Sequence, residues 1–274
     1  GNAIGETLRR EYPNTSFTYE PGREQSNILL TSQGRVQLGI AHAQLAGRAL
    51  AGGEPFKQPV TNIRAIAVID PLAAMQVFSR QGSDFQSFEQ VRRDKKPIRV
   101  ALNQRGTMMA LAGEELLAAK GIPAKDVEAW GGKVHYVAYN EGLEMMKNKQ
   151  VDLIVNLLAF PSGQVASATR EMPVQMVGLT PEVQGALQKS LGMMPIEVPA
   201  KTYDFQPAAV PSATATVVLV ANASMSDEDA GKIVSAMLRN MDFLKQSHAM
   251  MRQLDPAALA RVAPLTLHPG AEKA

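Results

Sequence analysis

The fold class is decided by residues 98–107, whose sequence is IRVALNQRGT. Its first five positions are mostly aliphatic, which is typical of a buried strand. The polar residues after Leu102 end that run, and residues 107–119 then repeat apolar side chains at helical spacing before Gly121, a residue that often ends a helix. A strand, a polar turn and a helix in this order form the repeating unit of an α/β protein.

The same alternation recurs along the chain on both sides of this stretch. Helices are predicted at 4–10, 107–119 and 226–246. Strands are predicted at 16–19, 36–40, 63–69, 98–102, 134–137, 153–157, 174–177 and 214–220. The alternation predicts an α/β fold with a parallel or mixed sheet.

Two proline-containing stretches, 94–97 and 205–212, have the composition of joints between lobes. If the chain crosses at both, residues 1–97 plus 212–274 form lobe I and residues 98–211 form lobe II. Two lobes joined by two crossings make a clamshell with a ligand cleft between them. The opening helix at 4–10 has no strand before it, so we expect an N-terminal strand to lie upstream of Gly1.

Composition excludes several classes of protein. The 274 residues carry a net charge of +2, and 45% are hydrophobic and 20% charged, as in ordinary globular proteins. The chain has no cysteine, so disulfides, thiol nucleophiles and cysteine-based metal sites are excluded. No basic run suggests nucleic acid, and the longest apolar stretches, 153–160 and 217–220, are far too short to span a membrane.

No catalytic motif is present. The four histidines lack the spacing of a metal-binding helix, and GxGxxG, GxSxG and a P-loop are all missing. The sequence therefore predicts no enzyme, no metal site and no cofactor.

Small polar residues instead cluster after predicted strands and before helices. They occur at 22–27, with Ser26 as the expected N-cap, at 42–44 and at 103–107, and Asn156 interrupts a fourth apolar strand. In open α/β sheets the ligand lies at the carboxyl ends of strands, so these groups predict a polar small-molecule site. Each also has an ordinary interpretation, because Ser26 and Asn27 serve as caps elsewhere, His42 is compatible with a buried core and Arg105 with a surface ion pair.

The order of these segments resembles the TAXI-type solute-binding proteins of TRAP transporters. The similar stretches are EPGREQSN at 20–27, GRVQLGI at 34–40, RVALNQRGT at 99–107, DVE followed by GGKV within 126–134, and LHPGA at 267–271. The resemblance implies a two-lobed periplasmic binding-protein fold (type II-like). It also implies export to the periplasm with removal of a signal peptide, and delivery of a small organic anion or amino acid to the transporter's membrane subunits.

Two departures from the family pattern bear on the ligand. Many members have Gln-x-Asp where this chain has His42-Ala43-Gln44, and many have Gly-Ser-Gly-Thr where it has Gln104-Arg105-Gly106-Thr107. Both changes make the site less negative, which favours an anionic ligand held through its carboxylate. The predicted ligand-binding residues are Ser26, Asn27, His42 and Gln44 of lobe I, with Asn103, Arg105, Gly106, Thr107, Asn156 and Phe160 of lobe II.

Three other classes are compatible with a fold of this kind. An ABC-type substrate-binding protein is the principal alternative. A porphobilinogen deaminase, which shares this architecture, attaches its cofactor through a cysteine that this chain lacks. A regulatory effector domain is the third class, but no DNA-binding segment accompanies it here.

Overall fold

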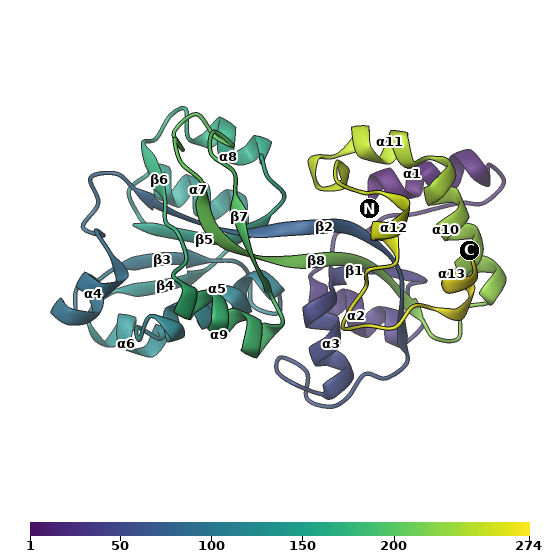
Figure 1. Ribbon diagram of the computed structural model, residues 1–274. Coiled ribbons are helices and arrows are strands. Elements are labelled where there is room, and N and C mark those ends of the chain that lie inside the picture. The colour runs from purple at the N-terminus through teal and green to yellow at the C-terminus, as the bar shows by residue number, and fades with distance from the viewer. The chain divides into compact units, whose positions relative to one another are not determined.

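The structure is a computed structural model that describes residues 1–274 (Figure 1). The chain divides into two compact units: unit 1 comprises Gly1–Ala73 and Thr216–Ala274, and unit 2 comprises Ala74–Ala215. The chain passes between units within two long strands, β2 (Ile63–Arg80) and β8 (Val210–Asn222).

This division differs from the one drawn from the sequence, which ended the first crossing at Pro97. The strand predicted at 63–69 continues through Pro71 for 18 residues in all. Its second half pairs with strands of unit 2, with Gln76 opposite Asn156 on β5 and Ser79 opposite Gln175 on β6. Residues 74–97 therefore fold with unit 2.

Unit 1 is built on β1 (Leu38–His42), which pairs antiparallel with β8 from Leu38↔Ala221 to His42↔Val217. Figure 1 shows α2 and α3 on one side of these strands and α1, α10 and α11 grouped on the other. The helices of unit 1 are α1 (Asn2–Glu11), α2 (Glu24–Ser32), α3 (Ala43–Ala51), α10 (Asp227–Arg239), α11 (Met241–Ser247), the 3-10 helix η1 (Ala249–Met251), α12 (Pro256–Leu259) and α13 (Pro269–Lys273).

Unit 2 is a mixed sheet with helices on both faces. Its strands are the second half of β2, β3 (Arg99–Leu102), β4 (Lys133–Tyr136), β5 (Leu153–Leu158), β6 (Val174–Met176), β7 (Met194–Val198) and the start of β8. Strand β3 runs parallel to both β4 and β5, and β2 runs antiparallel to β5 and β6. Its helices are α4 (Phe88–Asp94), α5 (Met108–Ala119), α6 (Ala124–Ala129), α7 (Tyr139–Lys147), α8 (Gly163–Ala168) and α9 (Pro181–Leu191).

Two glycines show how closely the helices pack on opposite faces of this sheet. A β-carbon at Gly113 of α5 would lie 2.6 Å from the Leu102 side chain, and one at Gly142 of α7 would lie 2.9 Å from Ile154. Neighbouring strand residues point to opposite faces, and Ala101, which also faces Gly142, precedes Leu102. Helices α5 and α7 therefore cover opposite faces, and the N-termini of both follow the carboxyl ends of parallel strands (Figure 1).

Three elements depart from the sequence prediction. Residues 16–19 form no strand, because they are mostly exposed and have no partner to pair with. The helix predicted at 226–246 breaks at Asn240 into α10 and α11. Strand β7 was missed because it contains Pro195, which is tolerated only because β7 pairs with β8 alone, at the edge of the sheet.

Candidate functional site

His42 is the last residue of β1 and the N-cap of α3, and it is 3% exposed. Its backbone N–H donates to Glu24 Oε2 (3.0 Å), and its Nδ1–H donates to the same oxygen (2.9 Å). Glu24 begins α2, so one carboxylate connects the N-termini of two helices, where negative charge is favourable. The Nε2 atom of His42 is buried and has no hydrogen-bond partner.

Asp70 of β2 supplies a second buried carboxyl group near this histidine. It is 3% exposed, and Oδ1 accepts one hydrogen bond from the Leu72 amide (3.0 Å). Burial raises the pKa of Asp70 to about 6, against the opposing effects of that hydrogen bond and of the His42 charge. Burial alone would lower the pKa of His42, but the charge and hydrogen bond of Glu24 and the charge of Asp70 outweigh it, so the pKa is raised.

The other predicted residues of unit 1 have mixed surroundings. Ser26 lies exposed inside α2, and Arg23 rather than Ser26 is the N-cap, because the helix begins three residues earlier than the sequence suggested. Asn27 donates through Nδ2 to the Ile40 carbonyl (2.9 Å) and so ties α2 to β1. Gln44 is buried, and its Oε1 accepts from the Thr216 amide (3.2 Å), which leaves its amide nitrogen without a partner.

In unit 2 the turn after β3 is held by its own side chains. Asn103 Oδ1 accepts from the Gln104 amide (2.7 Å), and Thr107 donates to the Gln104 carbonyl (2.7 Å) while its hydroxyl caps the Ala110 amide (3.2 Å). Gly106 has φ +81°, a backbone conformation that favours glycine. Thr107 is thus the N-cap of α5, at the residue where the sequence placed the start of this helix.

Arg105 lies on the rim of this turn and is 69% exposed. Its guanidinium stacks on the Tyr136 ring, 3.5 Å from the centroid, and makes a long 3.5 Å contact with Glu114. Tyr136 donates to the same carboxylate (2.6 Å), and burial together with that bond raises the pKa of Tyr136 to about 12. The charge of Arg105 is therefore shared with a surface carboxylate.

A group of hydrogen-bonded amides and hydroxyls lies around Asn156, inside β5. Asn103 Nδ2 donates to Asn156 Oδ1 (3.2 Å), so the structure brings two predicted residues together. Directly opposite Asn156 in the sheet is Gln76, fully buried, whose Oε1 accepts from the Tyr203 hydroxyl (2.6 Å). Tyr203 in turn accepts from the Ser162 amide (3.0 Å). The predicted residue Phe160 is partly buried and precedes a cis peptide bond to Pro161.

Sequence reasoning missed Glu24, Asp70, Gln76 and Tyr203. Asp70 and Gln76 stand inside the apolar run of β2, and a polar residue in a strand otherwise buried on both faces was the available signal. Glu24 and Tyr203 lie in segments with no such contrast, and only the fold brings them to His42 and Gln76.

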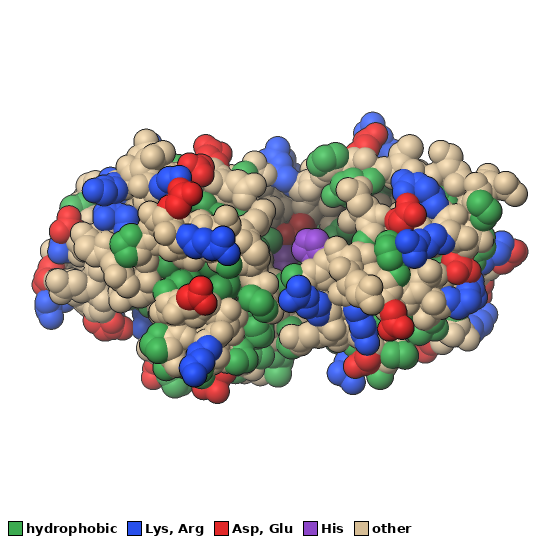
Figure 2. Space-filling model, turned by 90° about the horizontal axis from the view of Figure 1, so that it is seen from above, with side chains coloured by type: hydrophobic (Ala, Val, Ile, Leu, Met, Phe, Trp, Pro, Cys, Tyr) green, Lys and Arg blue, Asp and Glu red, His purple; other side chains and the backbone are tan.

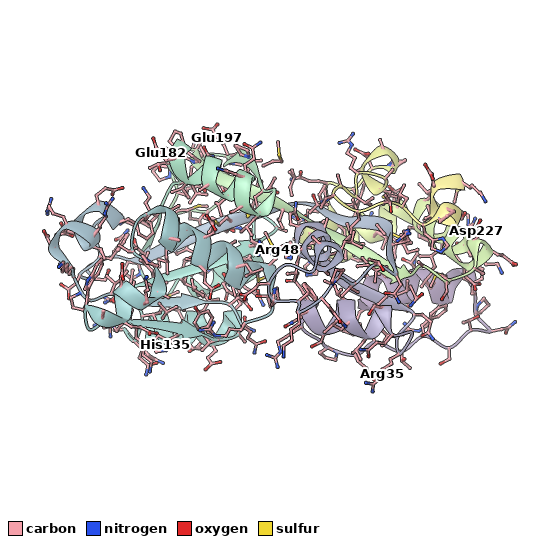
Figure 3. All side chains as sticks on the ribbon, turned by 90° about the horizontal axis from the view of Figure 1, so that it is seen from below. Arg35, Arg48, His135, Glu182, Glu197 and Asp227 are labelled. Atoms are coloured by element: carbon pink, nitrogen blue, oxygen red, sulfur yellow. The ribbon has the colours of Figure 1, made fainter.

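Two cavities hold none of the predicted residues. One of about 480 Å³ in unit 2 is lined by Glu89, Arg92, Arg93, Lys120 and Glu182, the last labelled in Figure 3, and Lys120 pairs with Glu89 (2.9 Å). The other, of about 340 Å³ in unit 1, is lined in part by Leu72 and Thr216, whose amides bond to Asp70 and Gln44. The second cavity therefore adjoins the backbone that holds two of the polar groups of unit 1.

The face of the molecule drawn in Figure 2 shows no concentration of one charge. In Figure 2 basic and acidic side chains are interspersed over the visible face rather than gathered into a patch. None of the helices is both long and apolar enough to cross a bilayer.

Comparison with known proteins identifies the family of this chain and solved structures with a similar fold. A model of the NMT1-like family matches residues 1–274, and no curated protein matches. Among solved structures, MatC from Rhodopseudomonas palustris with bound malate is 13% identical, with a TM-score of 0.60 over 94% of this chain and 87% of that one. PhnD1 from Prochlorococcus marinus in complex with methylphosphonate is also 13% identical, with a TM-score of 0.59 over 92% and 83%. The periplasmic binding protein BugD is 15% identical, with a TM-score of 0.57 over 94% and 85%.

These similarities confirm the predicted fold class, an α/β chain with the two-lobed fold of periplasmic binding proteins. At identities of 13–15% they carry the fold and not the ligand.

Proposed function

We propose that this chain, which belongs to the NMT1-like family, is an extracytoplasmic solute-binding protein without catalytic activity. It captures a small organic acid or amino acid and delivers it to a membrane transporter. The observation that carries the proposal is the set of polar side chains held at strand ends in a fold that its structural neighbours use to bind small molecules. Malate in MatC and methylphosphonate in PhnD1 are both small anions.

The site residues of unit 1 in this proposal are Ser26, Asn27, His42 and Gln44. Gln44 is the best placed to donate to a carboxylate, because its oxygen is occupied by Thr216 and its amide nitrogen is unused. Asn27 is already committed to the Ile40 carbonyl, so we expect it to act mainly by positioning α2.

The site residues of unit 2 are Asn103, Arg105, Gly106, Thr107, Asn156 and Phe160. The partly buried Asn103–Asn156 pair supplies uncharged hydrogen-bonding groups, and Arg105 supplies the cation. One solute molecule per chain is the expected stoichiometry.

The transporter we propose is of the TRAP type, on the resemblance of the EPGREQSN, LGI and LHPGA stretches to TAXI proteins. An ABC-type receptor is the alternative, since the fold alone does not distinguish the two kinds of transporter. Reconstitution of the purified chain with TRAP membrane subunits, and separately with an ABC permease, from the same source distinguishes the two. If the chain stimulates solute uptake only when it is reconstituted with the ABC permease, the TRAP assignment is rejected.

Native mass spectrometry of the chain purified from the periplasm tests the binding function. The expected result is a mass increase of a single small molecule, which is lost on denaturation and identified by fragmentation. Calorimetry with the identified compound should then give one site per chain. Purification free of any bound molecule, combined with no heat from a library of organic acids and amino acids, would reject the proposal.

A further inference from the structure

His42 and the two carboxyl groups beside it form a buried cluster that the proposed function leaves partly unexplained. The sequence alone suggested that residues 42–44 make the site less negative, because Gln44 stands where the TAXI pattern has an aspartate. The structure reverses that reasoning, since Glu24 bonds to His42 and Asp70 lies close enough for its charge to act on the ring. With both carboxyl groups ionised and the imidazole protonated, the cluster carries a net charge of −1.

Of the two ring nitrogens of His42, one is hydrogen-bonded and the other is not. Nδ1 points at Glu24, at 2.9 Å, so Nε2 on the other side of the imidazole points away from Glu24. Nε2 is buried without a partner in a side chain that is only 4% exposed. A buried polar atom of this kind destabilises the fold unless a bound molecule satisfies it.

Asp70 has unused capacity of the same kind. Its only hydrogen bond is the one that Oδ1 accepts from Leu72, so Oδ2 is open to a donor. The cavity of about 340 Å³ in the same unit is lined by Leu72 itself, together with Thr216 and Arg261. Neither His42 nor Asp70 lines this cavity itself, but its wall includes Leu72, whose amide donates to Asp70.

From this geometry we propose that the Glu24–His42–Asp70 cluster binds a hydrogen-bond-donating substituent of the solute, a hydroxyl or an ammonium group, and not its carboxylate. The inference rests on the proposed function and narrows its ligand to hydroxy acids and amino acids. A hydroxyl accepts from Nε2–H and donates to Asp70, whereas an ammonium donates to Asp70 and to a neutral Nε2. A carboxylate is disfavoured, because it would place a third negative charge beside Glu24 and Asp70.

Glu24 is the positioning residue of the cluster. Because it accepts from both the backbone N–H and Nδ1–H of His42, it fixes the ring orientation that aims Nε2 away from α2. Asp70 is the residue that contacts the solute, and it provides the selectivity for a donor.

The test uses matched acids that differ in one substituent. Thermal shift and calorimetry are run on the full chain with succinate, malate and aspartate, and with the corresponding unsubstituted, 2-hydroxy and 2-amino acids of two to six carbons. We expect at least one hydroxy or amino acid to bind roughly tenfold or more tightly than its unsubstituted partner. Tighter binding of the hydroxy acid would identify the recognised substituent as a hydroxyl, and tighter binding of the amino acid would identify it as an ammonium group.

Asp70→Asn is the decisive variant, because it keeps the shape of the side chain and removes the charged acceptor. It should reduce the preference for the substituted acid to less than threefold, whereas Asp242→Asn, the same change at an exposed position of α11, should leave the preference intact. Circular dichroism of both variants checks that the fold is retained, and Glu24→Gln should weaken the preference in part.

Two outcomes reject the inference and are distinguishable. If unsubstituted acids bind as tightly as their hydroxy and amino partners, or if Asp70→Asn keeps the preference, the cluster does not bind a hydrogen-bond donor of the solute. The proposed solute-binding function would be unaffected by that result. If no acid of the panel binds at all, the proposed class of organic-acid ligand fails, and the inference fails with it.

Discussion

Gly270 packs directly on the backbone of Asp227. A β-carbon at residue 270 would lie 2.1 Å from the Asp227 carbonyl oxygen, far inside van der Waals contact. Asp227 is the first residue of α10, where Figure 3 labels it, and Gly270 belongs to α13. The buried His268 accepts from the Gly270 amide (3.2 Å) and caps this helix, so the LHPGA stretch forms a close joint between two helices of unit 1.

Gly270→Ala should therefore destabilise unit 1. The added methyl group forces α13 away from α10, and overpacking of this kind costs about 1–3 kcal/mol. Chemical denaturation measures the free energy of unfolding. The matched control is Gly185→Ala in α9, where the new β-carbon meets no atom within 4 Å and the better helix former should be neutral or stabilising. Equal stabilities for the two variants would show that the joint can relax.

Tyr203→Phe tests the buried polar group of unit 2. The variant removes the hydroxyl that donates to Gln76 (2.6 Å) and accepts from Ser162 (3.0 Å), and Gln76 is fully buried. Leaving Gln76 Oε1 without a donor should lower the free energy of unfolding by about 1–3 kcal/mol. Tyr19→Phe, at a tyrosine that is 52% exposed, is the control and should change it by less than about 0.5 kcal/mol. A loss no larger than that of the control would mean that water replaces the hydroxyl.

Local patterns in the sequence were sufficient to predict the α/β class and most strands, because residues such as Val100 and Ile154 lie in short aliphatic runs that pair with neighbours of the same kind. They failed at β2, where Pro71 signals an end but the strand continues. The boundary between units was placed separately, at the proline-containing stretch 94–97, whereas the chain crosses within β2. A proline stops a strand only if its missing N–H is needed by a partner, and that depends on tertiary structure.

The candidate site was predictable only in part. His42 and the Asn103–Asn156 pair stand at strand ends, which is a local signal. Glu24 is 18 residues from His42, and Asp70 is a further 28 away, so their meeting depends on how the strands are ordered in the sheet. For that reason, residues 42–44 alone were not sufficient to predict the charge of the site.

The raised pKa of Asp70 predicts a pH-dependent difference between the native chain and Asp70→Asn. Burial raises the pKa from an ordinary 3.8 to about 6, so the folded state holds its proton more tightly than the unfolded state. The resulting stabilisation is complete below pH 4 and is lost as the pH rises through 6. Relative to Asp70→Asn, the native chain should lose up to about 3 kcal/mol between pH 4 and pH 7, as measured by urea denaturation at each pH. Parallel stability curves would show that Asp70 ionises with its ordinary pKa.

Arg105→Ala decides whether this residue holds the carboxylate of the solute. The guanidinium is 69% exposed, stacks on Tyr136 and makes only one long contact with Glu114, so most of its donors are available to an anion. Hydrogen bonds to charged groups contribute about 1.5–3 kcal/mol, and loss of the side chain should therefore weaken binding roughly 10- to 150-fold. Arg105→Lys should restore only part of the affinity, because an ammonium lacks the planar fork and stacks less well on Tyr136.

The measurement is calorimetry with the compound identified by mass spectrometry, at low and at moderate ionic strength. Arg93→Ala is the matched control, since that arginine is likewise exposed and paired with a carboxylate, Asp94, at 2.7 Å, and lies on α4. If Arg105 is only a surface partner of Glu114, its removal costs no more than about 1 kcal/mol of stability and leaves affinity within threefold of the native value, as in the control. That result would remove Arg105 from the site and leave Gln44 as the donor to the carboxylate.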